Sequence, residues 1–165
     1  MKLLDQQQIN QKVKRLAIQI LEDNYTEAEI FLIGINNNGY EFAKLLKTAL
    51  RKRTKKVDVN LGRIKLNPAD PANHPIESSI AVEEFNEKVV IIVDDVANTG
   101  RTLFYACKPL MEVTPSRIEV AVLVDRTHKT FPIKVDYMGI SLATTLQDNI
   151  AVKIVNVEEK EVHLE

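Results

Sequence analysis

The most informative part of the sequence is Val89-Val90-Ile91-Ile92-Val93-Asp94-Asp95-Val96-Ala97-Asn98-Thr99-Gly100-Arg101-Thr102. Its first five residues are aliphatic and all β-branched, which is typical of a strand buried on both faces of a parallel sheet. Two carboxylates end that strand, and a loop of small and polar residues then leads into a helix. In open α/β sheets, ligands bind at this carboxyl edge. The stretch therefore predicts both a core strand and a binding site.

The side chains of this stretch are suited to a polyol that carries phosphate. Gly100 lets the backbone approach a ligand closely. Thr99 and Thr102 supply hydroxyls, and the helix entry adds unpaired N–H groups at the positive end of the helix dipole. Two carboxylates ~4 Å apart repel each other by roughly 4 kcal/mol at an effective dielectric constant of about 20, so they need hydroxyl or metal-bound water partners. Neither the nucleotide P-loop pattern nor the dinucleotide-binding glycine pattern is present.

The segment Asp94–Thr102 resembles the phosphoribosyl pyrophosphate (PRPP) signature of type I phosphoribosyltransferases. The resemblance implies that Asp94 and Asp95 are catalytic, hold the ribose 2′ and 3′ hydroxyls and bind Mg²⁺, partly through those hydroxyls or through water. It also implies a loop that cups the 5′-phosphate, formed by Ala97, Asn98, Thr99, Gly100, Arg101 and Thr102. The alternative is a buried strand with an acidic turn and a threonine helix cap.

The chain as a whole predicts one α/β domain over residues 1–165, with a doubly wound, mostly parallel sheet flanked by helices. Asp5 can cap a helix that runs to about Asp23. The order strand, loop, helix occurs twice, first as Glu29–Ile35 with a helix from Tyr40 to about Arg53, and again at the signature with a helix from Gly100 to about Val113. We expect further strands at 57–66, 118–124, 134–140 and 151–157, and an antiparallel partner of the last at 161–164.

The turn Gly34–Gly39 follows the first core strand, at the position of the family's pyrophosphate loop. The resemblance therefore implies that the leaving diphosphate is bound by Ile35, Asn36, Asn37 and Asn38. Family members often have a cation here, and this chain has three asparagines instead. Because asparagine tolerates left-handed backbone angles, a plain strand-to-helix turn is the alternative.

Residues 62–86 are expected to form a small hood or flexible loop. Three prolines between Pro68 and Pro75 oppose regular structure there. In the family this interval contains a mobile hood that closes over the reacting centre and excludes water. Arg63 and Lys65 are then catalytic candidates that meet pyrophosphate oxygens, whereas an ordinary surface loop is the alternative.

The nucleobase is the least determined part of the hypothesis. The stretch from Ala121 through Asp125-Arg126-Thr127-His128 to Gly139 is similar to the pyrimidine-operon attenuation regulators, which also have uracil phosphoribosyltransferase activity. The resemblance places the base near the strand end and the loop 141–145, with contacts from Met138, Gly139, Ile140 and Ser141. Asp125 and Arg126 either help to orient the base or a magnesium ligand, or form a strand-end ion pair.

Asn98 bears on the choice of base. Purine-salvage members that resemble this signature place an aspartate at the corresponding position, where it handles the proton of the purine imidazole ring. An amide cannot act as a general base, so the residue disfavours 6-oxopurine chemistry.

Composition limits the other classes of function. The net charge of −1 gives no overall attraction to nucleic acid or to an anionic membrane. The basic run Arg51–Lys56 is either a solvated helix end or an RNA or partner contact. One cysteine, Cys107, excludes an internal disulfide framework. With no signal peptide and no apolar run of transmembrane length, we expect a cytoplasmic protein without membrane contact.

These observations favour transfer of a 5-phosphoribosyl group from PRPP-Mg²⁺ to a nucleobase, uracil first, with release of pyrophosphate. Two alternatives stay open: a PRPP- or nucleotide-sensing RNA-binding regulator with weak or no turnover, and a phosphoribosyltransferase for a purine base. The resemblance also implies a homodimer or a higher homo-oligomer.

Overall fold

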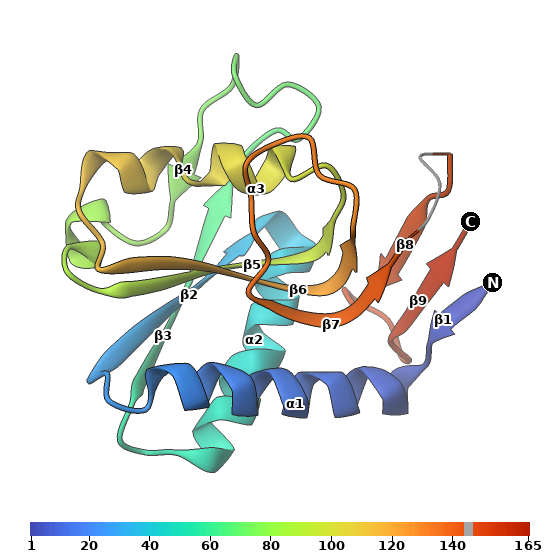
Figure 1. Cartoon of the computed structure of the whole chain (residues 1–165), viewed down its shortest axis with the longest axis horizontal. Coiled ribbons are helices and arrows are strands. Elements are labelled where there is room, and N and C mark those ends of the chain that lie inside the picture. The colour runs from blue at the N-terminus through green and yellow to red at the C-terminus, as the bar shows by residue number, and fades with distance from the viewer. Residues whose placement is uncertain (144–146) are drawn as a thin grey trace.

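The computed structural model describes residues 1–143 and 147–165, and a six-stranded sheet forms its centre (Figure 1). The strand order is β4-β3-β2-β5-β6-β7. All neighbouring strands are parallel except β3 and β4. The bounds are β2 (Glu29–Ile35), β3 (Asp58–Lys65), β4 (Glu77–Ser78), β5 (Val89–Ala97), β6 (Arg117–Arg126) and β7 (Tyr137–Leu142). The prediction of a doubly wound, mostly parallel sheet is confirmed.

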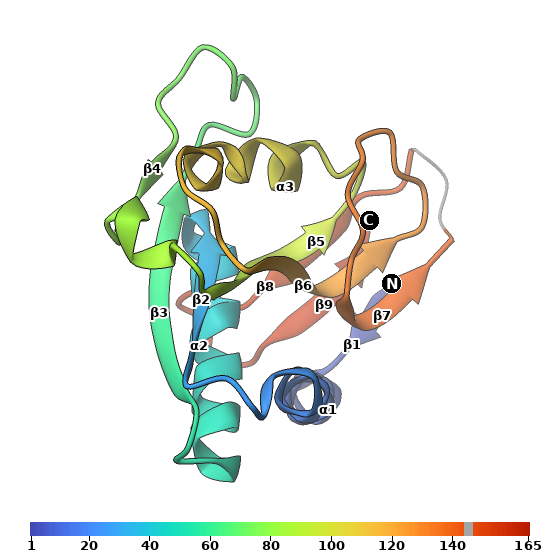
Figure 2. The ribbon, with the colours of Figure 1, turned by 60° about the vertical axis from the view of Figure 1, so that its left-hand side comes forward.

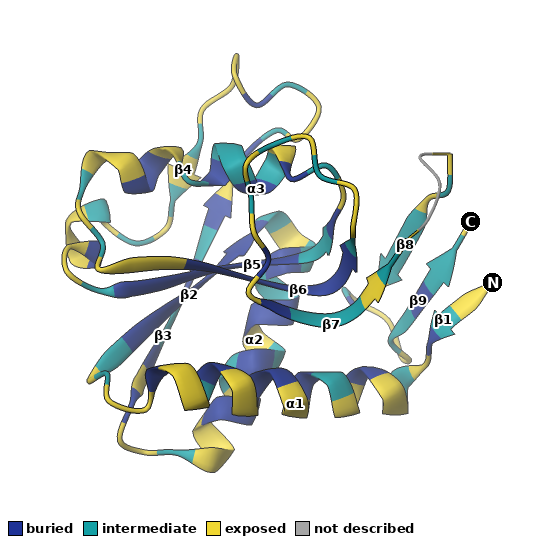
Figure 3. Cartoon of the chain, viewed as in Figure 1, coloured by how far each residue is buried: buried dark blue, intermediate teal, exposed yellow. Residues whose placement is uncertain are grey.

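Helices cover both faces of this sheet (Figures 1 and 2). Helices α1 (Gln6–Asn24) and α2 (Asn36–Arg53) pack on one face, and α3 (Arg101–Ala106) lies on the other with the 3-10 helices η1 (Val82–Phe85) and η2 (Lys108–Glu112). Each face has its own hydrophobic cluster, and β5 contributes fully buried residues to both. Figure 3 shows this burial along the central strands. The aliphatic run that opens the signature is therefore the middle of the core.

Helix α1 starts where the sequence predicts. The Asp5 carboxylate accepts a hydrogen bond from the Gln8 N–H at 2.8 Å, and the Gln8 side chain accepts one from the Asp5 N–H at 2.9 Å. This capping box satisfies two backbone donors that would otherwise lack partners. No helix in the described part of the chain has an apolar stretch long enough to cross a membrane.

A second, three-stranded antiparallel sheet joins the two ends of the chain. It has the order β1-β9-β8, with β1 (Lys2–Leu4), β8 (Ile150–Lys153) and β9 (Glu161–Leu164). The sequence predicted the pairing of β9 with β8 but not β1, because three residues are too few to show an alternating pattern. This sheet matters for the site because it places Ile150 and Val152 beside the first turn of α2.

Several element bounds differ from the prediction. Helix α2 begins at Asn36 rather than Tyr40, β7 begins at Tyr137 rather than Lys134, and β8 ends at Lys153. The helix after the signature ends at Ala106, and a 3-10 helix follows. Pro109 lies in the first turn of that 3-10 helix, and proline removes a backbone donor and clashes with the preceding turn of an α-helix. It therefore ends α3 early.

The segment 62–86 is anchored at both ends. Its first residues belong to β3. Near its other end, Phe85 is fully buried and contacts Phe31 edge-to-face at 5.2 Å between ring centroids. Between them, β4 pairs Ser78 and Glu77 with Ile64 and Lys65. The mostly exposed stretch before β4 projects beyond the sheet edge in Figure 2. Its closure over a ligand stays a prediction.

Candidate functional site

A cavity of about 440 Å³ opens at the carboxyl ends of β2 and β5. We call it the acidic cavity because Asp94 and Asp95 line it. Three segments that the sequence singled out meet there: the start of α2, the end of β5 and the loop after it. Its lining residues are Ile35, Asn36, Asn37, Asn38, Pro68, Asp94, Asp95, Val96, Asn98, Thr102 and Ile150. Pro68 and Ile150 were not predicted, because no sequence pattern links them to the signature.

The two carboxylates have different surroundings. Asp94 is buried, and its carboxylate accepts a hydrogen bond from the Asp95 N–H at 2.9 Å. Asp95 is half-buried and accepts hydrogen bonds from the Val96 N–H and from the Asn38 amide, both at 2.8 Å. Asn38 also contacts the Val152 carbonyl. The first turn of α2 is thus tied to the acidic pair.

Burial and the neighbouring charge of Asp95 raise the pKa of Asp94 well above its ordinary value. Desolvation is the larger cause, because an ionised carboxylate loses its hydration inside the protein. A cation or several hydroxyl donors in the cavity would stabilise the ionised form. The pair is therefore unfavourable in the free protein and suited to a ligand that supplies such partners.

This raised pKa predicts how stability depends on pH. An acid whose pKa is raised in the folded state binds its proton more tightly there, and this adds to the free energy of unfolding at low pH. The added stability is lost as the pH rises from the unfolded-state pKa, about 4, through the folded-state pKa. We expect the unfolding temperature of the ligand-free protein to fall over this interval relative to Asp94→Asn, which cannot ionise. Thermal denaturation of both proteins across pH provides the measurement. Parallel curves would contradict the assignment.

Helix α2 begins directly against β5. A Cβ atom on Gly39 would lie 2.5 Å from the Val93 carbonyl oxygen and 3.3 Å from the Asp94 Cα. Asn36 has a left-handed φ of 52°, and Ile35, at the N-cap, provides no side-chain cap. The turn predicted as Asn36–Gly39 is therefore the first turn of the helix, which corrects the predicted start at Tyr40. Backbone N–H groups of such a first turn are free to bind an anion.

The loop Ala97–Thr102 encloses a smaller cavity of about 40 Å³, which is lined by Val96–Leu103. Gly100 has a φ of 88° and lies at the N-cap of α3. Arg101 donates a hydrogen bond to the Pro68 carbonyl at 2.6 Å, which joins this loop to the segment before β4. Thr102 and Asn98 face the acidic cavity, so the two cavities are neighbours.

Comparison with known proteins identifies the family. The family model "Phosphoribosyl transferase domain" matches residues 1–160. The chain belongs to the phosphoribosyltransferase family. Curated relatives include the "Bifunctional protein PyrR" of Alkaliphilus metalliredigens, 33% identical over 96% of this chain and 91% of that protein. That of Pediococcus pentosaceus is 30% identical over 98% and 96%. The resemblance to the pyrimidine-operon attenuation regulators is thereby confirmed.

Solved structures show the same fold. A hypoxanthine-guanine phosphoribosyltransferase from Bacillus anthracis matches with a TM-score of 0.72 and 23% identity, over 86% of this chain and 81% of that one. The hypoxanthine phosphoribosyltransferase of Trypanosoma cruzi matches with a TM-score of 0.77 and 18% identity, over 98% and 95%. At these sequence identities the match shows the fold alone, so the base that this phosphoribosyltransferase uses cannot be inferred from these structures.

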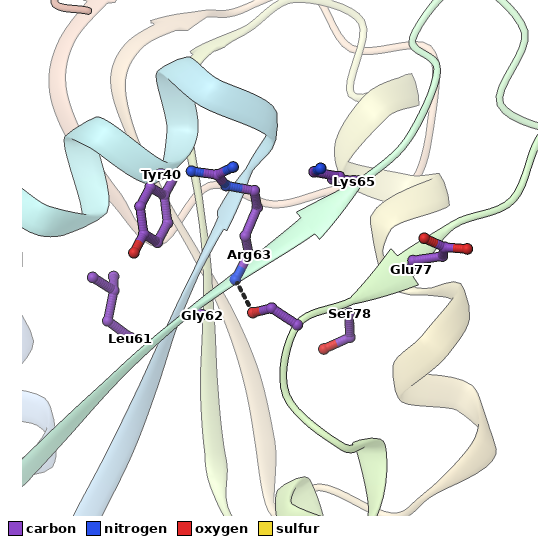
Figure 4. Close-up of a pocket in the computed structure, with 8 residues that line it drawn as sticks. Tyr40, Leu61, Gly62, Arg63, Lys65, Glu77 and Ser78 are labelled. Atoms are coloured by element: carbon purple, nitrogen blue, oxygen red, sulfur yellow. Dashed lines mark hydrogen bonds between the residues drawn. The ribbon is translucent and has the colours of Figure 1, made fainter.

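Arg63 and Lys65 line a different cavity of this phosphoribosyltransferase, of about 460 Å³ (Figure 4). The Arg63 guanidinium lies over the Tyr40 ring, 4.1 Å from its centroid, and its Nε has no hydrogen-bond partner among the described residues. Lys65 is exposed, with Glu77 opposite it on β4. Neither side chain lines the acidic cavity. They lie apart from the acidic pair, and their role beside the pyrophosphate stays a prediction.

The predicted base contacts lie on β7, and none of them lines the acidic cavity. Met138 and Gly139 line a cavity of about 290 Å³ together with residues of α1, and Met138 also packs against the hydrophobic cluster on the α3 face of the sheet. Ile140 packs against the core, and Ser141 is exposed. Ser141 pairs in register with Asp125, which in turn pairs with Ala97, so it lies at the same sheet edge as the signature loop. Thr144 and Thr145 of the predicted base loop lie outside the described residues.

Asp125 forms a strand-end ion pair, one of the two roles considered for it. Its carboxylate lies 2.6 Å from the Lys129 Nζ, and both side chains are largely buried. Arg126 donates a hydrogen bond to the Asn98 side-chain oxygen at 3.2 Å. The sequence analysis did not single out Lys129. Asp125 and Lys129 are four residues apart, a spacing that predicts an ion pair on a helix surface. Here the two residues lie in a strand and a loop, so the spacing alone did not predict their contact.

Proposed function

We propose that this phosphoribosyltransferase transfers a 5-phosphoribosyl group from PRPP to uracil and releases pyrophosphate. The observation that carries the proposal is the acidic cavity, in which a pair of carboxylates, an uncapped helix start and a glycine-containing loop meet. These three elements match the three parts of PRPP. The carboxylates fit the ribose hydroxyls, the loop fits the 5′-phosphate, and the first turn of α2 fits the diphosphate.

The reaction depends mainly on how the protein positions the ribose and the diphosphate of PRPP. Bond breaking at the anomeric carbon leaves an oxocarbenium-like ribosyl group, which nearby carboxylates stabilise electrostatically. Asp94 and Asp95 would hold the ribose hydroxyls and place negative charge beneath the ring. Asn38, which binds Asp95, would couple that contact to the diphosphate end of the cavity. Closure of the segment before β4, through Pro68 at the cavity wall, would exclude water.

The donor set fits Mg²⁺ that arrives with the substrate. Mg²⁺ is commonly held by one or two carboxylates together with waters and substrate phosphates. Asp94 and Asp95 provide two carboxylates, and the raised pKa of Asp94 indicates a site that favours added positive charge. The described residues contain no group of three or more acidic, histidine or cysteine side chains arranged to hold a metal alone. Bound there, the ion would act as a Lewis acid on the leaving diphosphate.

Uracil is proposed over a purine on two grounds. The curated relatives are PyrR proteins, and the resemblance to pyrimidine regulators continues past the signature. In addition, the Asn98 amide oxygen accepts a hydrogen bond from Arg126. This contact supports a loop-stabilising role for Asn98 rather than proton transfer to a purine ring.

The proposal predicts a selective reaction across a panel of bases. With PRPP and Mg²⁺, pyrophosphate release is expected with uracil and at most weakly with hypoxanthine or guanine. A coupled pyrophosphate assay, with each base supplied in turn, provides the measurement. Preferred release with a purine would reject uracil but keep the family activity. PRPP binding without release for any base would instead favour a regulator that senses PRPP.

An RNA-binding regulator is the second candidate, because the curated relatives carry the name PyrR and are called bifunctional. The basic run Arg51–Lys56 at the end of α2 is mostly exposed. Nucleic-acid binding through such a run would weaken steeply with salt. A titration of labelled pyrimidine-operon leader RNA at several salt concentrations therefore tests it, and absence of salt-dependent binding would reject it.

A further inference from the structure

The last residue of β6 and the stretch after it lie over the loop Ala97–Thr102. We call residues 126–133 the cover segment. The N–H groups of Thr130 and Phe131 both donate to the Thr99 carbonyl, at 3.0 and 3.1 Å. Arg126 adds the bond to the Asn98 side chain. Two backbone donors on one carbonyl fix the orientation of that peptide group.

This orientation matters for anion binding. The peptide bond between Thr99 and Gly100 is trans, so its N–H points opposite to its C=O. Because the Thr99 carbonyl faces the cover segment, the Gly100 N–H faces away from it. Gly100 lines the 40 Å³ cavity inside the loop. The cover segment therefore decides in which direction this donor of the loop points.

Packing adds to the hydrogen bonds. A Cβ atom on Gly100 would lie 3.2 Å from the Ile133 Cβ and 3.5 Å from the Lys129 Cδ. The Phe131 ring lies 5.6 Å from Phe104 on α3. The segment thus rests on the loop and on the helix that follows it, and little space separates them.

Lys129 holds the cover segment to the sheet. Its Nζ lies 2.6 Å from the carboxylate of Asp125, the residue that pairs with Ala97, and it also donates to the Arg126 carbonyl. The exposed fractions of the two side chains are 17% and 12%. Lys129 therefore has its charge compensated within the protein, which suits a structural tie better than a direct phosphate ligand.

We propose that Lys129 is a positioning residue for the 5′-phosphate. It fixes the cover segment, and the cover segment fixes the donors of the loop Ala97–Thr102. The proposal rests on the proposed function, because it takes the loop as the phosphate site. It assigns a role in binding the phosphate to a residue that does not touch the phosphate.

The test compares Lys129→Met, which keeps the aliphatic chain, with Lys129→Arg, which keeps the charge. Lys134→Met serves as the control because Lys134 is exposed in the same connection. We expect Lys129→Met to raise KM for PRPP by between about tenfold and a hundredfold with little change in kcat, as for a misplaced binding group. Lys129→Arg is expected to restore most of the loss.

Two further measurements keep the proposal separate from the proposed function. Calorimetry with ribose 5-phosphate reports the phosphate contact directly, and hydrogen exchange of the Gly100–Thr102 amides in the ligand-free protein needs no substrate. We expect weaker binding and faster exchange in Lys129→Met only. If Lys129→Met fails to fold because Asp125 has lost its ion-pair partner, the double variant Asp125→Asn, Lys129→Met replaces it in these measurements. Unchanged exchange and unchanged ribose 5-phosphate affinity overturn the positioning role, whereas wild-type protein that binds neither PRPP nor ribose 5-phosphate overturns the proposed function.

Discussion

Replacement of both carboxylates, Asp94→Asn with Asp95→Asn, is expected to lower the affinity for PRPP-Mg²⁺ by at least about a hundredfold. Hydrogen bonds to charged groups contribute roughly 1.5–3 kcal/mol each, and two are removed, so the loss is at least about 3 kcal/mol. Isothermal titration calorimetry with PRPP and magnesium provides the measurement. Undiminished affinity in the double variant would refute the assignment of the pair to the ribose.

The same replacement should not weaken the fold. Each asparagine keeps one side-chain oxygen for the backbone bond from Asp95 or Val96, whereas the bond that Asp95 accepts from the Asn38 amide, worth about 1 kcal/mol, is lost. Against this loss, the double variant no longer buries an ionisable carboxylate beside a second charge, and burial followed by the charge of Asp95 is what raises the pKa of Asp94. We therefore expect the free double variant to be at least as heat-stable as the wild type at neutral pH, so that lost binding does not reflect unfolding. Asp58→Asn, at the exposed start of β3, is a matched control that should leave PRPP affinity unchanged.

Gly39→Ala is expected to destabilise the protein by about 1–3 kcal/mol, as overpacked core positions do, and to weaken PRPP binding as well. Alanine is intrinsically better than glycine in a helix by about 1 kcal/mol, so propensity alone predicts the opposite sign. The steric clash determines the sign of the stability change, because the new Cβ would lie 2.5 Å from the Val93 carbonyl oxygen, a backbone atom in the middle of the core. To relieve it, the first turn of α2 must move away from β5 and from Asp94.

Urea denaturation measures the first effect and calorimetry with PRPP the second. Gly62→Ala is the matched control. There the nearest atoms belong to the Ile80 side chain, at 2.6 and 2.9 Å, which can change rotamer more easily than a backbone can shift. A smaller loss of stability and normal PRPP affinity are expected for the control. Equal effects of the two substitutions would contradict the importance of the contact between α2 and β5.

Local sequence was sufficient for part of the site. The aliphatic run Val89–Val93 is typical of a strand buried on both faces in the middle of a sheet. The residues that follow it therefore lie at the carboxyl edge of that sheet, where ligands bind. The capping box at Asp5 is likewise a local device, and the helix starts there. In each case the relevant physical contacts lie within a few residues along the chain.

Other parts depend on contacts that the sequence does not display. Asn36, Asn37, Asn38 and Gly39 are poor helix formers, yet they make the first turn of α2, because close packing against β5 outweighs propensity. Alternation along β3 predicts that Arg63 and Lys65 share a face, but it cannot tell which residues lie against that face. In the structure, Tyr40 of α2 lies against Arg63, and Lys65 is exposed. Lys129 and Ile150 reach the signature only through long-range packing.

Adjacent residues were sufficient to predict the central strand, the acidic pair at its end and the glycine loop that follows. The distant groups that face those residues could be found only from the folded chain. In the folded chain, the start of α2 and β8 line the acidic cavity, the cover segment packs on the loop Ala97–Thr102, and Arg63 and Lys65 line a different cavity. The physical reason is that packing between elements depends on the shapes of both partners, whereas a linear pattern reports on one element at a time.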